Sequence, residues 1–417
     1  MSDAPTRPVD VASDIEILLQ EKTLQLFEPQ LTADAGALKS NNIPTRKGDI
    51  IEWTRLLLPE GTSSELTASA QPEAERIYSM DVRTQAKEYG QKVQIERIVE
   101  LTSKHIQIAT TGAKAISKMA AKTADALMVD LLAQNAYRIR ADGDSTYQVN
   151  VTTTSDGNAG GTTFVSTSLT GTPSFVGGYA TITGVDSSKV SREAIHETRK
   201  ISAQSTSTIT VDTAFSSQIK SGCTVHLCVG TGIVATDKLT TDIFAKACTR
   251  LTLNDAWRFD GQPGQNLPPK KGQGGYWMLF YDANVFYDFM RDVDWVATGQ
   301  YQAKEQLERG LPAPRWMNVE FHGTTRGYRE DVDGTKNLTS GAVHVCNFVG
   351  QEAYGISQVM APGAAPPYGL VTSLMTSKDL GQTVPRFSEA GYIMYFGKTS
   401  LCSMWNIAVL AGATDVA

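Results

Sequence analysis

The alternation of apolar and polar residues near the start of the chain predicts a β-hairpin with a long tip. Residues 48–58 (GDIIEWTRLLL) and 76–88 (RIYSMDVRTQAKE) are rich in β-branched and aromatic side chains and alternate in part between apolar and polar positions, which is typical of strands. The stretch between them, PEGTSSELTASAQPEAE, is polar and contains several turn-forming residues. Because hairpin loops usually have about 2–5 residues, a tip of this length indicates either a function or a lack of fixed structure.

The apolar spacing changes from a strand period to a helix period within residues 88–136. A strand through Val93, Ile95 and Ile98 is followed, from about Thr102, by an uninterrupted helical pattern. At 1.5 Å per residue, such a helix extends over roughly 50 Å. We expect one apolar stripe of this helix to pack on the β-layer of its own domain, and its members lie at helical spacing: Ile116, Ala120, Thr123, Leu127 and Leu131.

Residues 141–232 form a block in which Ser, Thr and Gly dominate. Short β patterns such as YATITGV, STITVDTAF and CTVHLCV alternate there with turn signals such as DGNAGG. Only REAIHETRK, at 192–200, offers a possible helical period. The pattern therefore predicts an inserted small all-β domain, compatible with a sandwich or a barrel.

The remaining segments predict an N-terminal arm and a mixed C-terminal part. Residues 1 to about 46 combine an irregular start with a short amphipathic pattern, which is typical of an arm that packs on another surface. LTTDIFAKACTRL (239–251) has helical spacing with Thr241 as the expected N-cap, and 282–295 predicts a second N-capped helix. Apolar runs predict strands at 276–281, 317–323, 342–350, 391–397 and 403–410.

The composition is typical of a soluble globular protein and excludes several classes of function. The chain has 417 residues, 41% of them hydrophobic, and a prior of about 150 residues per domain suggests two or three domains. A net charge of −6 provides no basic field that would draw the whole protein onto nucleic acid or an anionic membrane. The start of the chain lacks the apolar core of a signal peptide, and no stretch approaches the ~18 apolar residues of a membrane helix. Five scattered cysteines form no disulfide framework, which favours folding in a reducing cytoplasm.

Two groups of residues resemble metal sites without matching one. In CTVHLC, Cys223 and Cys228 are separated by an odd number of positions, so they point to opposite faces of a strand. A buried structural role is therefore favoured, and metal binding remains the alternative. Asp288, Asp292 and Asp294 lack the spacing of a calcium loop, so a solvated acidic helix face is favoured over a cation site.

Catalytic motifs are also missing from the sequence. None of the five histidines has the context of a nucleophile or zinc motif, and GQGGYW lacks the lysine of a phosphate-binding loop. We therefore expect no catalytic residue, no cofactor and no metal, and a structural protein rather than an enzyme. A stripe of Lys114, Lys118 and Lys122 favours a solvated helix face, with phosphate contact as the alternative if the helix lines a compartment that holds nucleic acid.

The order of these elements resembles the Hong Kong ninety-seven type capsid fold of tailed bacteriophages, in its N-four-like major capsid protein family. The similarity covers most of residues 45–360 outside the 141–232 block, which is larger than the family pattern requires. The stretches that carry it are EYGQKVQIERIVELTS, LTTDIFAKACTRL, YWMLFYDANVFYDF with DVDWV, NVEFHGTTRGYRED and FVGQEAYGI.

The resemblance implies an α+β capsid fold with an inserted all-β domain. The implied parts are an N-terminal arm (1–46), an extended hairpin or E-loop (47–88), a peripheral domain with a spine helix (89–140), the β-rich insertion (141–232), a mainly axial domain (233–365) and a return to the peripheral domain with C-terminal strands (366–417). It further implies a subunit that self-assembles, in the bacterial cytoplasm, as hexamers and pentamers of an icosahedral virion shell around double-stranded DNA.

The resemblance also suggests where the subunit meets its partners. Neighbouring capsid subunits would be contacted through the arm and the E-loop, with scaffold, portal and decoration proteins as further partners, weak contact with packaged DNA and no membrane. The lysine stripe Lys114, Lys118 and Lys122 would face inward. Candidate contacts between subunits are Glu60, Glu65, Glu73 and Arg76.

Two other classes of protein remain open from the sequence. The chain could be another virion component, such as a decoration or tail protein, in which the β-rich block is the main body. It could also be a hydrolase with a β-rich accessory domain, although no catalytic group was found for it.

Overall fold

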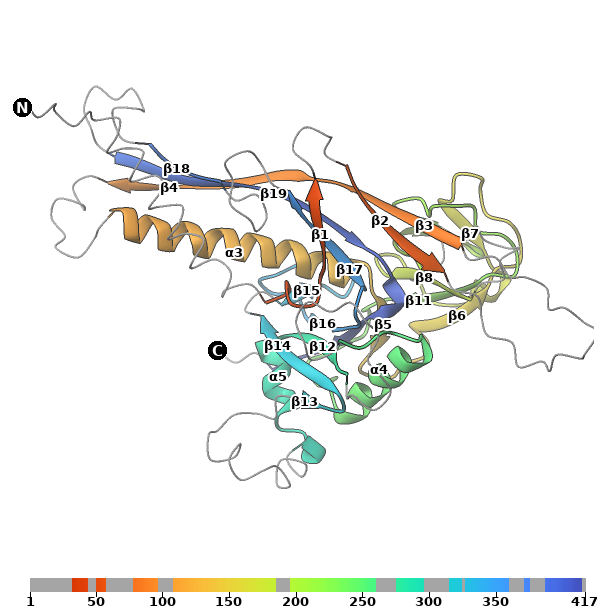
Figure 1. Cartoon of the computed structure of the whole chain (residues 1–417). Coiled ribbons are helices and arrows are strands. Elements are labelled where there is room, and N and C mark those ends of the chain that lie inside the picture. Colours follow the sequence, from red (N-terminus) through yellow and green to blue (C-terminus); the bar gives the residue numbers. More distant parts are fainter. Residues whose placement is uncertain are drawn as a thin grey trace, which may run out of the picture.

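In the computed structural model, three sheets and a two-stranded hairpin surround one long helix, α3 (Figure 1). The view shows α3 and a long strand layer extending to one side, a β-rich unit on the other side, and two shorter helices below. The structure describes residues 32–43, 50–57, 78–96, 108–184, 196–259, 275–295, 315–324, 327–359, 371–375 and 387–414.

A five-stranded sheet, called the outer sheet, covers one side of α3. Its longest strand, β19, pairs antiparallel with β4 over Phe387–Phe396 and then with β17 over Phe396–Ser400, so it joins both halves of the sheet. β1 adds to β17 in parallel, which brings an N-terminal segment beside a C-terminal one. The strands are β1 (Leu38–Ile43), β4 (Lys87–Glu96), β17 (Tyr354–Val359), β18 (Val371–Met375) and β19 (Phe387–Ser400).

The predicted hairpin is present as β2 (Ile50–Leu57) and β3 (Tyr78–Gln85), which pair antiparallel along their full length. Only Ala86 separates β3 from β4, so the hairpin continues directly into the outer sheet (Figure 1). The hairpin prediction is therefore confirmed for its two strands, and the tip at 58–77 lies outside the described residues.

A seven-stranded sheet, called the central sheet, forms the main core. Residues Val343–Val349 and Asn406–Ala411 are buried at every position, which explains the unbroken apolar runs in the sequence. The last strand pairs with the strand at Tyr137–Arg140, so the end of the chain returns to the residues that follow α3. The strands are β5 (Tyr137–Arg140), β12 (Trp277–Asp282), β13 (Arg315–Trp316), β14 (Val319–Thr324), β15 (Tyr328–Glu330), β16 (Val343–Val349) and β20 (Asn406–Ala411).

Two helices, α4 (Thr241–Leu253) and α5 (Ala283–Phe289), pack on the central sheet. The sequence predicted both helices but not where they pack. Phe244 of α4 lies within 4.9 Å of the Phe348 ring of β16, centre to centre, in an edge-on contact. The expected N-cap, Thr241, is wrong by one position. Thr240 has the extended backbone of a cap, and its hydroxyl accepts a hydrogen bond from the Ile243 amide.

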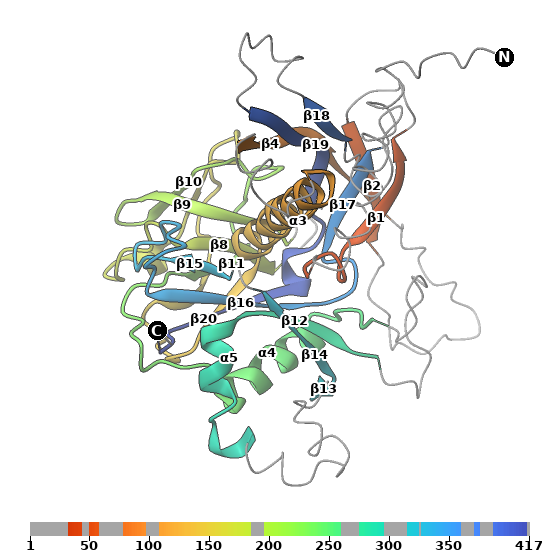
Figure 2. The same cartoon turned by 90° about the vertical axis from the view of Figure 1, so that its left-hand side faces the viewer.

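Helix α3 (Ile108–Gln134) lies between the outer and central sheets, as the view close to its axis shows (Figure 2). The predicted helix is confirmed over these residues, but its predicted packing stripe is incomplete. Thr123 and Leu127 are only half-buried, whereas Ala124 and Met128, on the neighbouring face, are fully buried. The stripe was derived for a helix that packs on one layer, and α3 packs on two. Towards the central sheet, Asp125 accepts hydrogen bonds from the Ala33 amide and, on its other oxygen, the Thr324 hydroxyl.

The Ser/Thr/Gly-rich block contains a six-stranded antiparallel sheet with its own apolar core, called the six-stranded unit. Its role as an insertion remains a prediction. The possible helix at 192–200 is wrong at its described end, where Thr198–Gln204 is a strand. The strands are β6 (Gln148–Thr152), β7 (Thr163–Val165), β8 (Tyr179–Gly184), β9 (Thr198–Gln204), β10 (Thr208–Val211) and β11 (Thr224–Cys228), with a short helix η2 (Thr167–Leu169).

Arg138 of β5 links the six-stranded unit to the rest of the chain. Its guanidinium donates two hydrogen bonds, of 2.6 and 3.1 Å, to the Glu330 carboxylate of β15, and lies 3.7 Å from the centre of the Tyr179 ring of β8. The two charged side chains are 1% and 0% exposed. Burial by itself lowers the pKa of Arg138, but Glu330 outweighs this effect and holds that pKa above its ordinary value. The pair therefore stays ionised inside the core.

Removing one partner of this ion pair should destabilise the fold more than removing both. Glu330→Leu leaves the Arg138 charge buried without its counter-ion, and we expect a loss of about 3–5 kcal/mol in the free energy of unfolding. The double variant Arg138→Met, Glu330→Leu should lose clearly less. Lys246→Ala, at the exposed pair of Lys246 and Asp242, is the matched control and should cost less than about 0.5 kcal/mol. Chemical denaturation followed by circular dichroism measures all three, and a double variant less stable than Glu330→Leu contradicts the account.

His226 of β11 should make the fold sensitive to mild acid. Burial lowers the pKa of His226 to about 4, from 6.5, with the Arg138 carbonyl opposing this shift. A histidine with a lowered pKa binds fewer protons in the folded chain, so stability falls as the pH falls from 6.5 towards 4. We expect His226 to account for about 3 kcal/mol of lost stability between pH 7 and pH 4. Urea titrations at both pH values measure it, and an equal loss in His226→Gln contradicts the assignment.

Candidate assembly surfaces

The base of the hairpin is fixed to the outer sheet through two glycines. Ile51 and Trp53 of β2 are buried, at 4% and 7% exposure, and point towards Gly397 of β19 and Gly355 of β17. A Cβ atom on Gly355 would lie 2.8 Å from Trp53 Cε2, and one on Gly397 would lie 2.9 Å from Ile51 Cδ1. Only a residue without a side chain leaves room for these two apolar groups.

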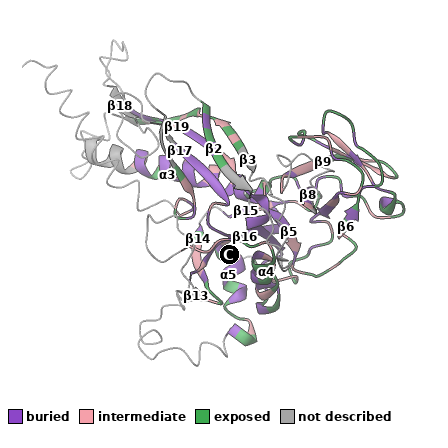
Figure 3. Cartoon of the chain, turned by 45° about the vertical axis from the view of Figure 1, so that its right-hand side comes forward, coloured by how far each residue is buried: buried purple, intermediate pink, exposed green. Residues whose placement is uncertain are grey.

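The opposite face of the hairpin is polar and exposed (Figure 3). Arg83 of β3 pairs with Glu52 of β2 at 3.2 Å, and the Thr54 hydroxyl donates a hydrogen bond of 2.9 Å to Asp81. Both interactions lie on the surface, so they contribute little to stability. One face of the hairpin therefore holds it to its own body, and the other face is available to a second molecule.

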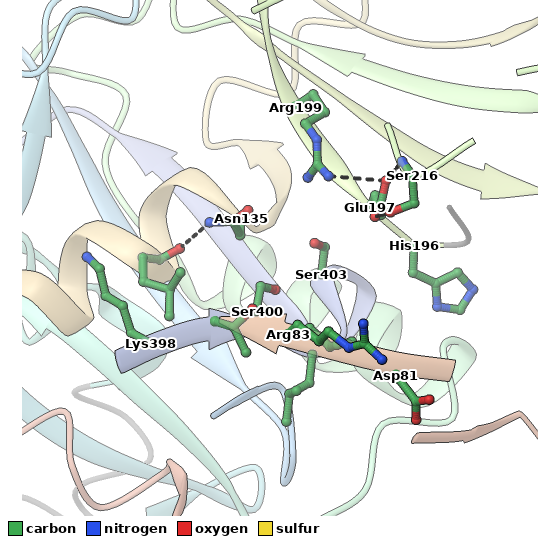
Figure 4. A pocket seen from close by; sticks show the side chains of 14 residues that line it. Asp81, Arg83, Asn135, His196, Glu197, Arg199, Ser216, Lys398, Ser400 and Ser403 are labelled. Carbon is green, nitrogen blue, oxygen red and sulfur yellow. Dashed lines mark hydrogen bonds and ion pairs between the residues drawn. The ribbon is translucent and has the colours of Figure 1, made fainter. Parts of the chain in front are cut away.

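A polar cavity of about 350 Å³ lies where the hairpin, the end of α3, the six-stranded unit and the end of β19 meet, and we call it the junction cavity (Figure 4). The short helix η4 (Ser403–Trp405), which follows β19, closes one side. The polar lining residues are Asp81, Arg83, Asn135, His196, Glu197, Arg199, Ser216, Lys398, Thr399, Ser400 and Ser403.

The charges of the junction cavity are partly neutralised by each other. Glu197 accepts a hydrogen bond of 2.9 Å from the Ser216 amide and pairs with Arg199 at 3.2 Å. On another wall, the Lys398 ammonium donates to the Leu127 carbonyl of α3. Burial lowers the pKa of Lys398 to about 8, and the nearby Lys336 and Lys87 add to this shift, while Asp130 opposes it.

The seven residues predicted as contacts are not brought together by the described structure. Glu60, Glu65, Glu73 and Arg76 lie in the hairpin tip, outside the described residues. In the lysine stripe, Lys118 is exposed and Lys122 is half-buried, and the side chain of Lys114 lies outside the described part. Two described lysines at helical spacing fit a solvated helix face, and their contact with DNA remains a prediction.

In CTVHLC, both ring nitrogens of His226 have partners within the fold, which favours the predicted buried structural role. Its Nε2 donates to the Arg138 carbonyl at 2.9 Å, and its Nδ1 lies 2.8 Å from Asn150 Oδ1 and 3.2 Å from the Tyr137 hydroxyl. Burial also raises the pKa of the Cys228 thiol to about 12, which keeps it protonated. Across the described ranges, no group of three or more acidic, His or Cys side chains is placed to hold a metal ion.

The acidic residues near α5 serve as hydrogen-bond acceptors within the fold. Asp288 accepts from the Lys238 ammonium at 2.8 Å, and Asp292 accepts from the Thr241 amide at 3.1 Å. Asp288 is also buried, which corrects the predicted solvated acidic face at that position. Of the helices that are described, none combines the length and apolar character needed to cross a membrane.

The sequence did not reveal the residues that build the base of the hairpin and the junction cavity. Trp53 could have been found, because it lies at an apolar position of an alternating strand. Gly355 and Gly397 gave no signal, because the need for a glycine depends on a strand that is over 300 residues away in sequence. The cavity residues Arg83 and Lys398 gave none either, since their proximity depends on the packing of separate elements.

Comparison with known proteins finds similar folds among phage capsids. No protein-family model and no curated protein matches the chain. The chain is similar to the capsid of Ralstonia phage GP4, at 12% identity, 94% coverage of this chain, 92% coverage of that chain and a TM-score of 0.49. It is also similar to the capsid of cyanophage Pam1 (11%, 93%, 92% and 0.48) and the head structure of Helicobacter pylori bacteriophage KHP40 (9%, 92%, 89% and 0.48). Because these TM-scores lie below 0.5, the functional argument rests on the geometry of the chain itself.

Adding a methyl group at Gly355 should loosen the hairpin. The new Cβ of Gly355→Ala would lie 2.8 Å from Trp53, so we expect a loss of about 1–3 kcal/mol and faster proteolysis of the hairpin. Gly391→Ala, in β19, is the matched control, because its Cβ finds no atom nearer than 3.4 Å. The control should keep or slightly raise the stability. Limited proteolysis with mass spectrometry measures the effect, and equal cleavage of both variants contradicts the glycine argument.

Proposed function

We propose that this chain is the major capsid protein of a tailed bacteriophage, with a Hong Kong ninety-seven type fold of the N-four-like family. Copies of it assemble as hexamers and pentamers into the icosahedral shell that encloses the double-stranded DNA genome in the virion. The observation that carries the proposal is the hairpin β2–β3, which is held to its own body by one face and continues into the long outer sheet.

The shape of the subunit supports self-association. α3 and the outer sheet extend away from the central sheet and the six-stranded unit (Figure 1). Elements that project from a body bury more of their surface only against other molecules, and closed symmetry supplies the same neighbour repeatedly. The polar outer face of the hairpin fits the rim of such an interface, because rims are polar and accessible to solvent.

Under this proposal, each part of the fold corresponds to a part of a capsid subunit. The outer sheet with α3 forms the peripheral domain and its spine, and the central sheet with α4 and α5 forms most of the axial domain. The six-stranded unit is an insertion that decorates the exterior. The tip residues Glu60, Glu65, Glu73 and Arg76 contact the neighbouring subunit, and the stripe of Lys114, Lys118 and Lys122 faces the genome. Scaffold, portal and decoration proteins are further partners.

The acidity of the chain fits a container for DNA. A net charge of −6 keeps the overall attraction to phosphate weak, and each phosphate contact would add a salt-dependent affinity that hinders movement of the genome. A catalytic role finds no support in the described residues, where the thiols of Cys228, Cys248 and Cys346 are buried and have pKa values raised to about 12 by that burial.

Sedimentation and negative-stain electron microscopy of the purified chain, alone and in lysate, test the proposed function. We expect large closed particles with regular capsomers, in which this chain is the most abundant protein. A chain that remains a compact monomer under all assembly conditions, with or without other virion proteins, contradicts the proposal.

Removing the hairpin tip should impair assembly without unfolding the body. Deletion of residues 60–75 leaves Ile51, Trp53 and their glycine contacts in place, so circular dichroism and the melting temperature should stay close to those of the full chain. The fraction of protein in particles should fall severalfold. A second variant, in which residues 60–75 are replaced by Gly and Ser, keeps the length of the tip. It distinguishes the effect of a shorter tip from the effect of the missing side chains. Particles that form and survive heating as before would show that the tip is not needed.

A further inference from the structure

We propose that His226 is an acid-sensitive latch between the six-stranded unit and the body, and that protonation of its ring releases the unit while both apolar cores stay folded. The body is here the outer and central sheets with α3, α4 and α5. This conformational device goes beyond the proposed function and does not depend on it. Three observations carry the proposal: the unit is closed on itself, its face towards the body is polar, and cations surround His226.

The six-stranded unit has a closed form that does not require the body. The Thr154 amide, two residues after β6, donates a hydrogen bond of 2.9 Å to the Val165 carbonyl of β7, the strand at the other end of the sheet. The Ser166 hydroxyl adds a bond of 2.7 Å to the Thr152 carbonyl. Closure of a sheet removes its edges, and the apolar residues inside the unit form a cluster separate from the main core. Release from the body therefore leaves the core of the unit covered.

The unit meets the body through a polar face of two neighbouring strands. Leu227 of β11 packs in the core of the unit, so His226 and Cys228, at the alternate positions, point to the other face. On β8, Thr181 and Tyr179 occupy the opposed positions. These four side chains are at most 4% exposed, and β11 lies beside β5 of the central sheet (Figure 1). Polar contacts of this kind are typical of parts that move relative to one another.

His226 joins the unit to the body in its neutral form. Its Nε2 donates a hydrogen bond of 2.9 Å to the Arg138 carbonyl of β5, so Nδ1 of the neutral ring accepts from the Tyr137 hydroxyl at 3.2 Å. The Tyr137 and His226 rings are stacked, with centres 4.2 Å apart. Asn150 Oδ1, 2.8 Å from Nδ1, would accept a hydrogen bond from a charged ring. Hydrogen bonding alone therefore does not oppose protonation.

Burial and two guanidinium groups oppose a positive charge on His226. Burial is the largest cause of its lowered pKa of about 4, and Arg250 of α4, which lies 4.6 Å from the centre of the Tyr137 ring, adds to it. The Arg250 Nε has no hydrogen-bond partner among the described residues. Arg138 already occupies the Glu330 carboxylate with two hydrogen bonds. The other titratable or charged groups around the contact are Tyr179, Cys228, Arg140 and Asp142.

The contact between the unit and the body weakens as the pH falls. The pKa of His226 is about 4 in the closed form, and its ordinary value of 6.5 returns when the ring reaches water. The released form therefore binds more protons between these two pH values, so a fall in pH within this window favours release. From pH 7 to pH 5, the ratio of released to closed chains should rise at least about tenfold.

Thiol labelling of the unassembled full-length chain with 4,4′-dithiodipyridine tests the release, because three buried cysteines report on three places. Cys228 lies at the contact with the body, Cys223 in the core of the unit and Cys346 in the main core. We expect the labelling rate of Cys228, measured by mass spectrometry relative to the urea-unfolded chain, to rise at least about tenfold from pH 7 to pH 5. Cys223 and Cys346 should stay protected. Equal labelling of all three at pH 5, or no rise at Cys228, overturns the proposal.

A variant that cannot titrate assigns the effect to the ring. His226→Gln keeps a donor for the Arg138 carbonyl but binds no proton, so the acid-dependent rise at Cys228 should disappear. His322→Gln, at a half-buried histidine of β14, is the matched control and should keep the full rise. A rise in His226→Gln as large as that of the control overturns the assignment.

The proton itself can be followed in the unaltered chain, which avoids any folding defect of a variant. NMR of the chain labelled with ¹³C at histidine Cε1 measures the charge of each ring, and His226→Gln identifies the signal. We expect His226 to gain its proton over the same pH range in which Cys228 becomes reactive. A ring that becomes charged while Cys228 stays protected, or one that stays neutral while Cys228 reacts, overturns the latch.

Discussion

The buried guanidinium of Arg138 is the interaction on which the arrangement of the subunit depends. It emerges from the residues directly after α3, pairs with Glu330 of the central sheet and lies against Tyr179 of the six-stranded unit. A charge in this position needs all of its partners at once, because each lost contact leaves a group without solvent and without a counter-ion. The pair therefore fixes the orientation of three parts of the chain rather than adding stability to any one of them.

This fixed joint explains how a chain with long projecting elements can be rigid. α3 is held on both faces, by the outer sheet through Thr123 and Tyr392, whose hydroxyl groups lie 2.9 Å apart, and by the central sheet through Asp125. The hairpin, in contrast, is attached through two apolar residues in glycine-lined space. The described structure thus combines a stiff body with a projecting hairpin whose outer face is polar. A subunit that assembles through projecting elements is expected to have both features.

The sequence was informative wherever structure depends on local periodicity. The hairpin strands, the long helix, α4 and α5 follow from periods of 2 or 3.6 residues and from N-cap signals. The buried strands β12, β16 and β20 follow from unbroken apolar runs. The face of α3 was harder to predict, because the pattern of Ile116 to Leu131 does not reveal that a second layer covers Ala124 and Met128. Neighbouring threonines at 240 and 241 made the N-cap ambiguous by one residue.

Residues that act across the fold could not be found in this way. Arg138 and Glu330 are separated by 192 positions, and nothing in either local sequence marks them as partners. Gly355 and Gly397 are needed only because Trp53 and Ile51 arrive from a distant strand. The junction cavity depends on four separate elements meeting, so its charges have no sequence signature. Function was predicted from the order of elements, and the contacts that would perform it required the folded chain.

The central claim is that the hairpin β2–β3 of one subunit packs on a neighbouring copy within a closed shell. Cryo-electron microscopy of particles assembled from the full-length chain tests it most directly. The account predicts an icosahedral map in which the hairpin of each subunit extends, beyond its base, over the adjacent subunit. A map in which every hairpin contacts only its own body, or the failure of the chain to form closed shells, would contradict the account.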